Sequence, residues 1–161
     1  MTHGFDDQGR QYDDKGNLKE WWTPADSVQF VKRTQKIIDQ FSGYTIYGLH
    51  VNGKATQGEN IADLGGVVIG ITAFEKTDQY KEGKTINGLT PMQRFFLGYA
   101  LGWLYEGRKE ITMSEVLTNP HSPPIFRVNG PFSDVPEFYQ AFNIKKGDKM
   151  WVDPAKRVKI W

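Results

Sequence analysis

The sequence predicts a mainly α-helical fold in a single domain, and three features of the chain lead to that prediction. Its 161 residues suffice for one domain with a sizeable core but are few for two. Apolar residues recur at helical spacing, and two such segments follow the dipeptides Thr23-Pro24 and Thr90-Pro91, which are typical helix starts. Aromatic residues make up 14% of the chain, which favours a packed interior. We therefore expect one domain over residues 1–161, with at most a small β-ladder.

Turn-forming residues divide the first half of the chain into a loop, two helices and a short extended segment. The expected elements are a loop over 4–22, a helix over 24–42, an extended segment over 44–49 that ends at the turn Asn52-Gly53, and a helix from about 56 to 78. Three glycines inside the second helix predict the close approach of another backbone, since each is unfavourable in a helix. These are Gly65, Gly66 and Gly70.

The second half is expected to contain a central helix and then less regular structure. Residues 92–106 are apolar on nearly every side, which predicts a buried helix. The chain is expected to become irregular after Lys109, with a stiff proline-rich loop over 119–124 and a turn at 129–131. A short amphipathic helix over 135–142 precedes a basic, aromatic tail that we expect to be docked on the domain.

Composition narrows the possible chemistry. The formal net charge of +1 provides no field for nucleic acid or an anionic membrane, so we expect no nucleic-acid partner. The longest apolar stretch, residues 95–104, is about half of the roughly 20 residues that cross a membrane, and the polar start lacks the pattern of a signal peptide. The chain contains no cysteine, so any metal ligands must be histidines and carboxylates.

Glu59 and Asp63 are four residues apart beside an apolar run, so on a helix they share one face. One interpretation is a metal ligand with a second carboxylate that orients the site. Two plainer ones remain open: acidic residues in a first helical turn favour the helix dipole, and Thr56 with Glu59 has the spacing of a capping box. The box would compete with metal binding for the same carboxylate.

Other motifs indicate structure rather than chemistry. Gly48 to Lys54 has the spacing of a phosphate-binding loop, but Ala55 stands where Ser or Thr must hold magnesium, so a hairpin turn at Asn52-Gly53 is favoured. The acidic loop 6–17 has Lys15 where a calcium ligand is needed, which favours a solvated loop. Each of the three histidines, taken alone, is more often structural than catalytic.

The segment Thr2-His3-Gly4-Phe5-Asp6-Asp7 resembles the continuation of the zinc-binding motif in the neprilysin and endothelin-converting enzyme family of zinc endopeptidases. In that family His-Glu-x-x-His runs directly into Gly-Phe-Asp-Asp, so Met1 and Thr2 would fill the two x positions. Further matches, in the family's order, are residues 21–23, 52–63, 120–123 and 126–128, and the terminal Trp161. The resemblance spans essentially the whole chain and implies the helical C-terminal part of a zincin-like catalytic domain.

The resemblance also implies a role for five side chains. His3 would be the second Zn²⁺ ligand and Glu59 the third. Asp63 would hydrogen-bond a ligand histidine, His121 would donate to the oxyanion of the tetrahedral intermediate, and Arg127 would bind a substrate carbonyl. The family usually has aspartate where Asn119 precedes the Pro-His pair, so the partner of His121 is neutral in this chain.

The resemblance implies a zinc metalloendopeptidase that hydrolyses small to medium peptides, with this chain as the C-terminal segment of a larger catalytic domain. The leading histidine and the general-base glutamate would precede Met1, so we expect this chain alone to be inactive and to hold Zn²⁺ weakly. Its expected partners are peptide substrates, the missing N-terminal part of the same polypeptide, and other copies that self-associate through exposed apolar surface. Family members suggest an extracytoplasmic or membrane-tethered location. The alternatives are a stand-alone, non-catalytic domain that binds peptides or a partner, and a structural assembly module.

Overall fold

The computed structural model describes residues 2–160, so the predictions that fall on Met1 and Trp161 lie outside the described residues. The helices are η1 (Thr2–Phe5), η2 (Gly9–Gln11), α1 (Pro24–Ser42), α2 (Gln57–Phe74), α3 (Asp78–Lys81), α4 (Pro91–Gly102), α5 (Lys109–Thr118), α6 (Pro124–Phe132) and α7 (Pro136–Phe142). Strands β1 (Thr45–Ile46) and β2 (Leu49–His50) form a two-stranded antiparallel sheet. The predicted fold class, mainly helical with a small β-ladder, is confirmed.

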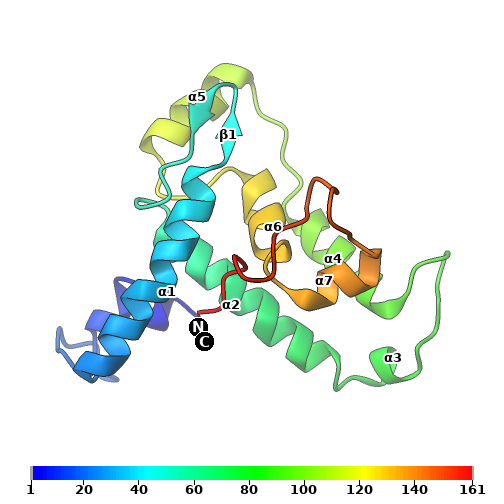
Figure 1. Cartoon of the computed structure of the whole chain (residues 1–161), viewed down its shortest axis with the longest axis horizontal. Coiled ribbons are helices and arrows are strands. Elements are labelled where there is room, and N and C mark those ends of the chain that lie inside the picture. The colour runs from blue at the N-terminus through cyan, green and yellow to red at the C-terminus, as the bar shows by residue number, and fades with distance from the viewer. Residues whose placement is uncertain (1, 161) are drawn as a thin grey trace.

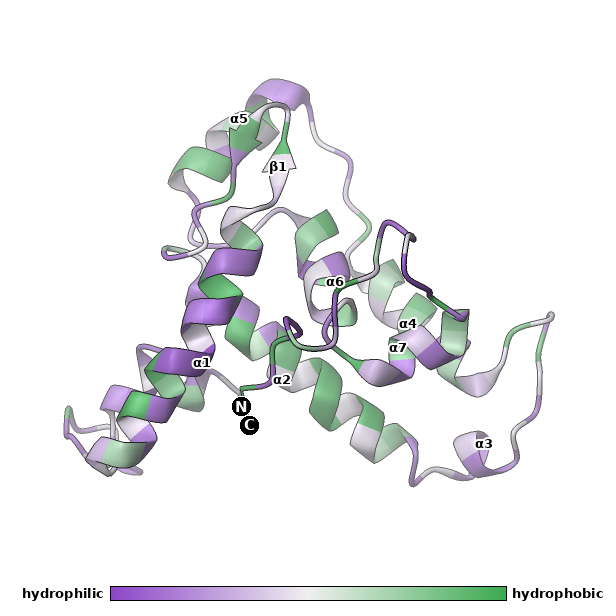
Figure 2. Ribbon diagram, viewed as in Figure 1, coloured by the Kyte–Doolittle hydropathy of each residue, from purple (hydrophilic) through white to green (hydrophobic). Residues whose placement is uncertain are grey.

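Helix α2 lies at the centre of the molecule, in contact with α1, α6 and η1 (Figure 1). Its central residues include Ile61 and Val67, whose exposed fractions are 0% and 1%. Figure 2 shows the corresponding contrast, with a largely apolar α2 and an α1 along which polar and apolar residues alternate. Because α2 is enclosed along its first half, a polar side chain there needs a partner inside the protein.

The predicted helix starts at the two Thr-Pro pairs are confirmed. The Thr23 hydroxyl accepts a hydrogen bond from a backbone N–H of α1, and Thr90 forms a complete capping box with Gln93. The prediction of a capping box between Thr56 and Glu59 is wrong, since the Thr56 side chain makes no cap hydrogen bond. The Glu59 carboxylate is therefore free to face other groups.

The hairpin turn lies five residues earlier than predicted. Tyr47 and Gly48 both have positive φ, 52° and 80°, and they connect β1 to β2, whereas Asn52-Gly53 lies in the turns before α2. A two-residue hairpin turn of this kind suits the right-handed twist of the strands. Tyrosine rarely adopts positive φ, so the sequence favoured the Asn-Gly pair.

The prediction of irregular structure after Lys109 is wrong, because α5 and α6 are both helices. The predicted turn at 129–131 lies inside α6, which tolerates Pro131 in its last turn. Proline removes one backbone donor, which would leave the carbonyl of Arg127, four residues earlier, without its usual partner. The hydroxyl of Tyr99 on α4 donates to that carbonyl at 3.3 Å.

Two of the three glycines predicted to mark a close backbone approach, Gly66 and Gly70, do not mark one. A Cβ at Gly70 would meet the ring of Phe95 at 3.2 Å, and one at Gly66 would have nothing within 4 Å. A glycine is sterically required instead at position 130 on α6, where a Cβ would overlap the ring of Phe41 on α1. The prediction was therefore wrong for Gly66 and Gly70.

The C-terminal segment docks on the domain as expected. Val158 and Ile160 are buried in the core, and the Arg33 guanidinium of α1 donates to the Ile160 carbonyl at 2.7 Å. Several large apolar side chains remain exposed, including Leu101, Leu104 and Leu117 at 65%, 78% and 71%. Self-association through such surface stays a prediction. None of the helices within residues 2–160 has the length and apolar character needed to span a bilayer.

Candidate functional site

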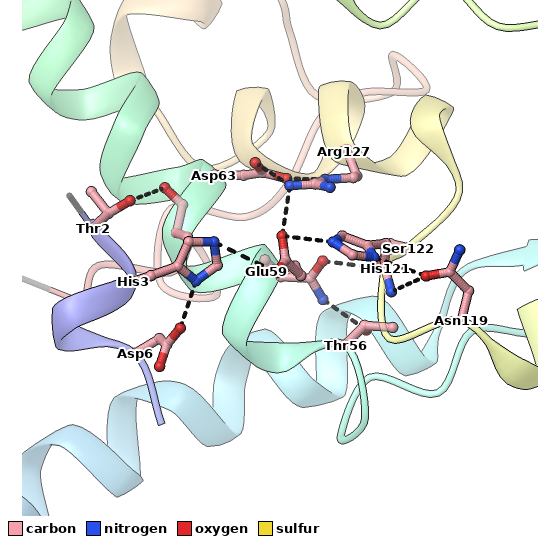
Figure 3. A network of polar contacts seen from close by, with 12 residues as sticks. Thr2, His3, Asp6, Thr56, Glu59, Asp63, Asn119, His121, Ser122 and Arg127 are labelled. Atoms are coloured by element: carbon pink, nitrogen blue, oxygen red, sulfur yellow. Dashed lines mark hydrogen bonds and ion pairs between the residues drawn. The ribbon is translucent and has the colours of Figure 1, made fainter. Parts of the chain in front are cut away.

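Four polar side chains from distant parts of the sequence converge at the N-terminal end of α2 (Figure 3). One oxygen of Glu59, Oε1, lies 3.5 Å from Nε2 of His3. The other oxygen, Oε2, lies 3.3 Å from Nε2 of His121 and 3.0 Å from Nη2 of Arg127. The structure thus brings together the predicted ligands and the predicted substrate-binding groups around one carboxylate.

His3 is held by a carboxylate that the sequence analysis did not single out. Its Nδ1 lies 2.7 Å from Oδ2 of Asp6, which is only 5% exposed. The other oxygen of Asp6 accepts backbone N–H groups of Gln8 and Gly9 at 2.9 and 2.7 Å, which fixes the carboxylate. A proton on Nδ1 leaves Nε2 with its lone pair directed toward Glu59, which is the tautomer that a metal-binding histidine needs.

The short helix η1 that carries His3 is anchored against α2. The hydroxyl of Thr2 donates to the carbonyl of Ala62 at 3.1 Å, and the Gln57 amide donates to Asp7 at 2.9 Å. A Cβ at Gly58 would come within 2.9 Å of Oδ1 of Asp7, so a glycine lets η1 approach the start of α2. The close contact with Asp7 therefore explains why glycine occupies position 58, directly before Glu59.

Arg127 and Asp63 form a bidentate ion pair beside Glu59. Nε and Nη2 of Arg127 donate to Oδ2 and Oδ1 of Asp63 at 2.6 and 2.8 Å, and the guanidinium stacks 4.2 Å above the Trp103 ring. Burial raises the pKa of Asp63, and the hydrogen bonds and charge of Arg127 oppose that rise. Although burial alone would lower it, the pKa of Arg127 is raised by Asp63 and Glu59.

Asp63 thus pairs with Arg127, whereas the partner of His3 is Asp6. The role predicted for Asp63 toward a ligand histidine stays a prediction. The signal for Asp6 was in the sequence, since it follows His3 by three residues within the matched motif.

His121 is oriented from within its own loop. The side-chain oxygen of Asn119 accepts the backbone N–H of His121 at 3.0 Å and faces its Nδ1 at 2.8 Å. Because this oxygen is an acceptor only, Nδ1 carries a proton, and Nε2 can donate to a substrate oxygen only when it carries a second one. The neutral Asn119 therefore orients the ring as an aspartate would, without adding a charge.

His3 and Glu59 fit two positions of a zinc site. Zinc bonds of 2.0–2.2 Å at tetrahedral angles place two ligand atoms about 3.4 Å apart. The observed separation of 3.5 Å between His3 Nε2 and Glu59 Oε1 matches that spacing, and it brings two acceptors face to face. Among residues 2–160 no group of three or more His, Cys, Asp and Glu is placed to hold a metal.

A histidine and a glutamate at the separation of two zinc ligands, beside a second histidine and an arginine, fit the residue types used by zinc-dependent hydrolases. Comparison with known proteins narrows this class. Residues 1–158 match the model of Peptidase family M13, and the chain belongs to that family. The predicted relationship to zinc metallopeptidases is confirmed.

The aligned parts of two relatives in the family are about two fifths identical to this chain. An endothelin-converting enzyme homolog of Locusta migratoria is 42% identical over 164 residues, which is 100% of this chain and 22% of that protein. Neprilysin-1 of Caenorhabditis elegans is 42% identical over 168 residues and is covered to the same 22%. The chain thus spans about a fifth of the length of these curated relatives.

Solved structures agree with the fold. The zinc metalloprotease ZMP1 of Mycobacterium tuberculosis, in complex with an inhibitor, superposes on this chain with a TM-score of 0.89 at 40% sequence identity. The match covers 99% of this chain and 25% of the ZMP1 chain. PepO from Lactobacillus rhamnosis gives a TM-score of 0.88 at 36% identity, with 99% of this chain and 24% of that chain covered.

Proposed function

We propose that this chain supplies the C-terminal part of the catalytic domain of a zinc metalloendopeptidase that hydrolyses small to medium peptides. The convergence of His3, His121 and Arg127 on the Glu59 carboxylate supports the proposal. In it, His3 and Glu59 hold Zn²⁺ together with a ligand from the remainder of the polypeptide. An extracytoplasmic or membrane-tethered location belongs to the same proposal.

Zinc, when bound, supplies Lewis-acid activation of the carbonyl and of a water molecule. The chain's own residues hold and orient the reactants. His121 and Arg127 face the ligand pair from one side and would stabilise negative charge on the substrate carbonyl oxygen. Arg127 can also bind substrate while it keeps Asp63, because within the described residues its Nη1 donates to no protein group.

Zinc titration by calorimetry tests the ligand pair. We expect weak binding to the purified chain that is lost in His3→Gln and in Glu59→Gln, since each removes one of two ligands. The matched control is Glu75→Gln, an exposed glutamate at the opposite end of α2, which should bind zinc as the unchanged chain does. Equal zinc binding by Glu59→Gln and the unchanged chain would refute the assignment.

The zinc-loaded chain alone should not hydrolyse a fluorogenic peptide. A catalytic zinc site has three protein ligands, and the described residues bring only His3 and Glu59 together for that purpose. The measurement compares the purified chain with buffer, with and without a chelator. Chelator-sensitive cleavage by the purified chain would contradict this expectation.

A second candidate function is peptide binding without catalysis. A cavity of about 150 Å³ adjoins His121 and Arg127. Its lining includes Trp103, Tyr105 and the two prolines that follow Ser122, and its volume suits a small side chain. In this case the metal-free chain would bind peptides, and Arg127→Ala would weaken that binding. Peptide affinity that depends entirely on added zinc would favour the first proposal.

A further inference from the structure

A buried series of hydrogen bonds connects the His121 loop to α2. The Ser122 hydroxyl donates to Oδ1 of Asn60 at 2.9 Å, and the Asn60 amide donates to the Thr56 hydroxyl at 2.9 Å. The Thr56 hydroxyl donates in turn to the carbonyl of Asn52 at 3.0 Å. Asn60 and Ser122 are 0% and 2% exposed, so water does not replace these bonds.

The direction of every bond in this series is determined. The Asn52 carbonyl can only accept, so Thr56 must donate to it and can then accept from the amide N–H of Asn60. The carbonyl oxygen of Asn60 consequently faces Ser122, which must be the donor. Removal of the Ser122 hydroxyl would leave that oxygen buried without a partner, which is unfavourable.

The series runs parallel to the contact between two site residues. Asn60 directly follows Glu59, and Ser122 directly follows His121, so the pairs 59–121 and 60–122 lie side by side between the same two segments. The bonds from Asn119 to His121 are confined to the loop and do not fix the loop relative to α2. The Ser122–Asn60 hydrogen bond does fix the loop relative to α2, because it joins the two segments.

We infer that Ser122 and Asn60 are positioning residues that hold His121 against Glu59. The inference rests on the proposed function, since His121 matters as a group that faces the zinc ligands. Neither side chain reaches the ligand pair itself. Their effect is on the place of the His121 ring, so it should be measurable without metal and without catalysis.

The test is a nuclear Overhauser effect between the ring protons of His121 and the side-chain methylene protons of Glu59 in the metal-free chain. We expect this signal in the unchanged chain and in Ser114→Ala, which removes an exposed serine from the preceding helix α5. Ser122→Ala should lose it while circular dichroism shows the helices intact. A signal of unchanged intensity in folded Ser122→Ala, or no signal in the unchanged chain, would overturn the inference.

Ser122→Cys provides a variant of nearly the same size with a weaker donor, in case the alanine variant does not fold. We expect a weakened signal, and one of full intensity would count against the inference. A purely structural serine would lower the melting temperature and leave the signal in place. Failure of zinc to bind would refute the proposed function but would not affect this metal-free measurement, so the two ideas can fail separately.

Discussion

Asp63 and Asp134 are buried to a similar extent, 9% and 6% exposed, yet the protein accommodates them in opposite ways. Asp63 on α2 receives two hydrogen bonds from the guanidinium of Arg127. Asp134, between α6 and α7, accepts the backbone N–H of Val158 at 2.8 Å, and its Oδ2 has no hydrogen-bond partner in the described part of the chain. Burial raises the pKa of Asp134 to about 7.

The difference shows what each carboxyl does in the fold. Asp63 lies in a site that needs a charge at a fixed place, and a cation beside it compensates for burial. Asp134 needs only an acceptor to dock the C-terminal segment, and a neutral carboxyl provides one. Loss of a partner should therefore destabilise the region around Asp63 most, whereas a change of pH should act mainly through Asp134, whose pKa is raised further.

Arg127→Met should have the largest effect. It leaves Asp63 buried without its cation, and breaking such a pair costs about 3–5 kcal/mol of unfolding free energy. Urea denaturation monitored by circular dichroism measures the loss. Arg108→Met, at an exposed position before α5, is the control and should change stability by less than about 0.5 kcal/mol. Equal effects of the two variants would show that the ion pair is unimportant.

Titration of Asp134, at its contact with Val158, should lower the free energy of unfolding of the unchanged chain as the pH rises. An aspartate with an unfolded pKa of 3.8 and a folded pKa of about 7 binds more protons in the folded state between those values. The contribution of Asp134 to the free energy of unfolding is therefore greatest below about pH 4, decreases up to about pH 7 and is constant above it. The decrease attributable to Asp134 is at most about 4 kcal/mol.

Asp134→Asn isolates this contribution in denaturation curves recorded from pH 4 to 8. The amide keeps an acceptor for Val158 and cannot ionise, so this part of the pH dependence should disappear and stability at pH 8 should rise. Asp39→Asn, at an exposed position on α1, should leave the curve unchanged. A curve for Asp134→Asn that falls as steeply as the original would show that Asp134 titrates normally.

Arg157→Gln should have the smallest effect of these substitutions. The Arg157 guanidinium stacks 3.5 Å from the Tyr139 ring, and its positive charge lowers the pKa of Asp134. Loss of the guanidinium should lower the free energy of unfolding by about 1 kcal/mol. It should also move the decrease in stability that Asp134 causes to higher pH. Lys156→Gln, at an exposed position next to it, should do neither. A decrease that moves to lower pH would contradict the assigned electrostatics.

Local sequence chemistry predicted the parts of the fold that depend on neighbouring residues. Thr23 and Thr90 were identified as helix starts because capping needs only residues within one turn. Helix α6 was missed because the prolines around Pro123 argue locally against helix, whereas Pro124 begins α6 and Tyr99 satisfies the carbonyl that Pro131 leaves open. Helix α5 was missed because its apolar residues do not gather on one face.

The sequence named residues that lie close together in the structure, but it did not show which of them pair. Motif resemblance identified Glu59 and His121, and the structure places them 3.3 Å apart. The Arg127–Asp63 pair connects residues 64 positions apart, and no local pattern carries such information. For the same reason the sequence did not show that Ser122 donates to Asn60.

The hydrogen bond from Arg33 to the Ile160 carbonyl joins groups 127 residues apart along the chain. Closing a loop of that length has an entropic cost that is recovered only when Val158 and Ile160 enter the core. Contacts of such long sequence separation slow folding, and this one cannot form on the ribosome before Ile160 has emerged. Until then the nascent chain exposes the apolar faces that Val158 and Ile160 cover, which makes it prone to aggregation.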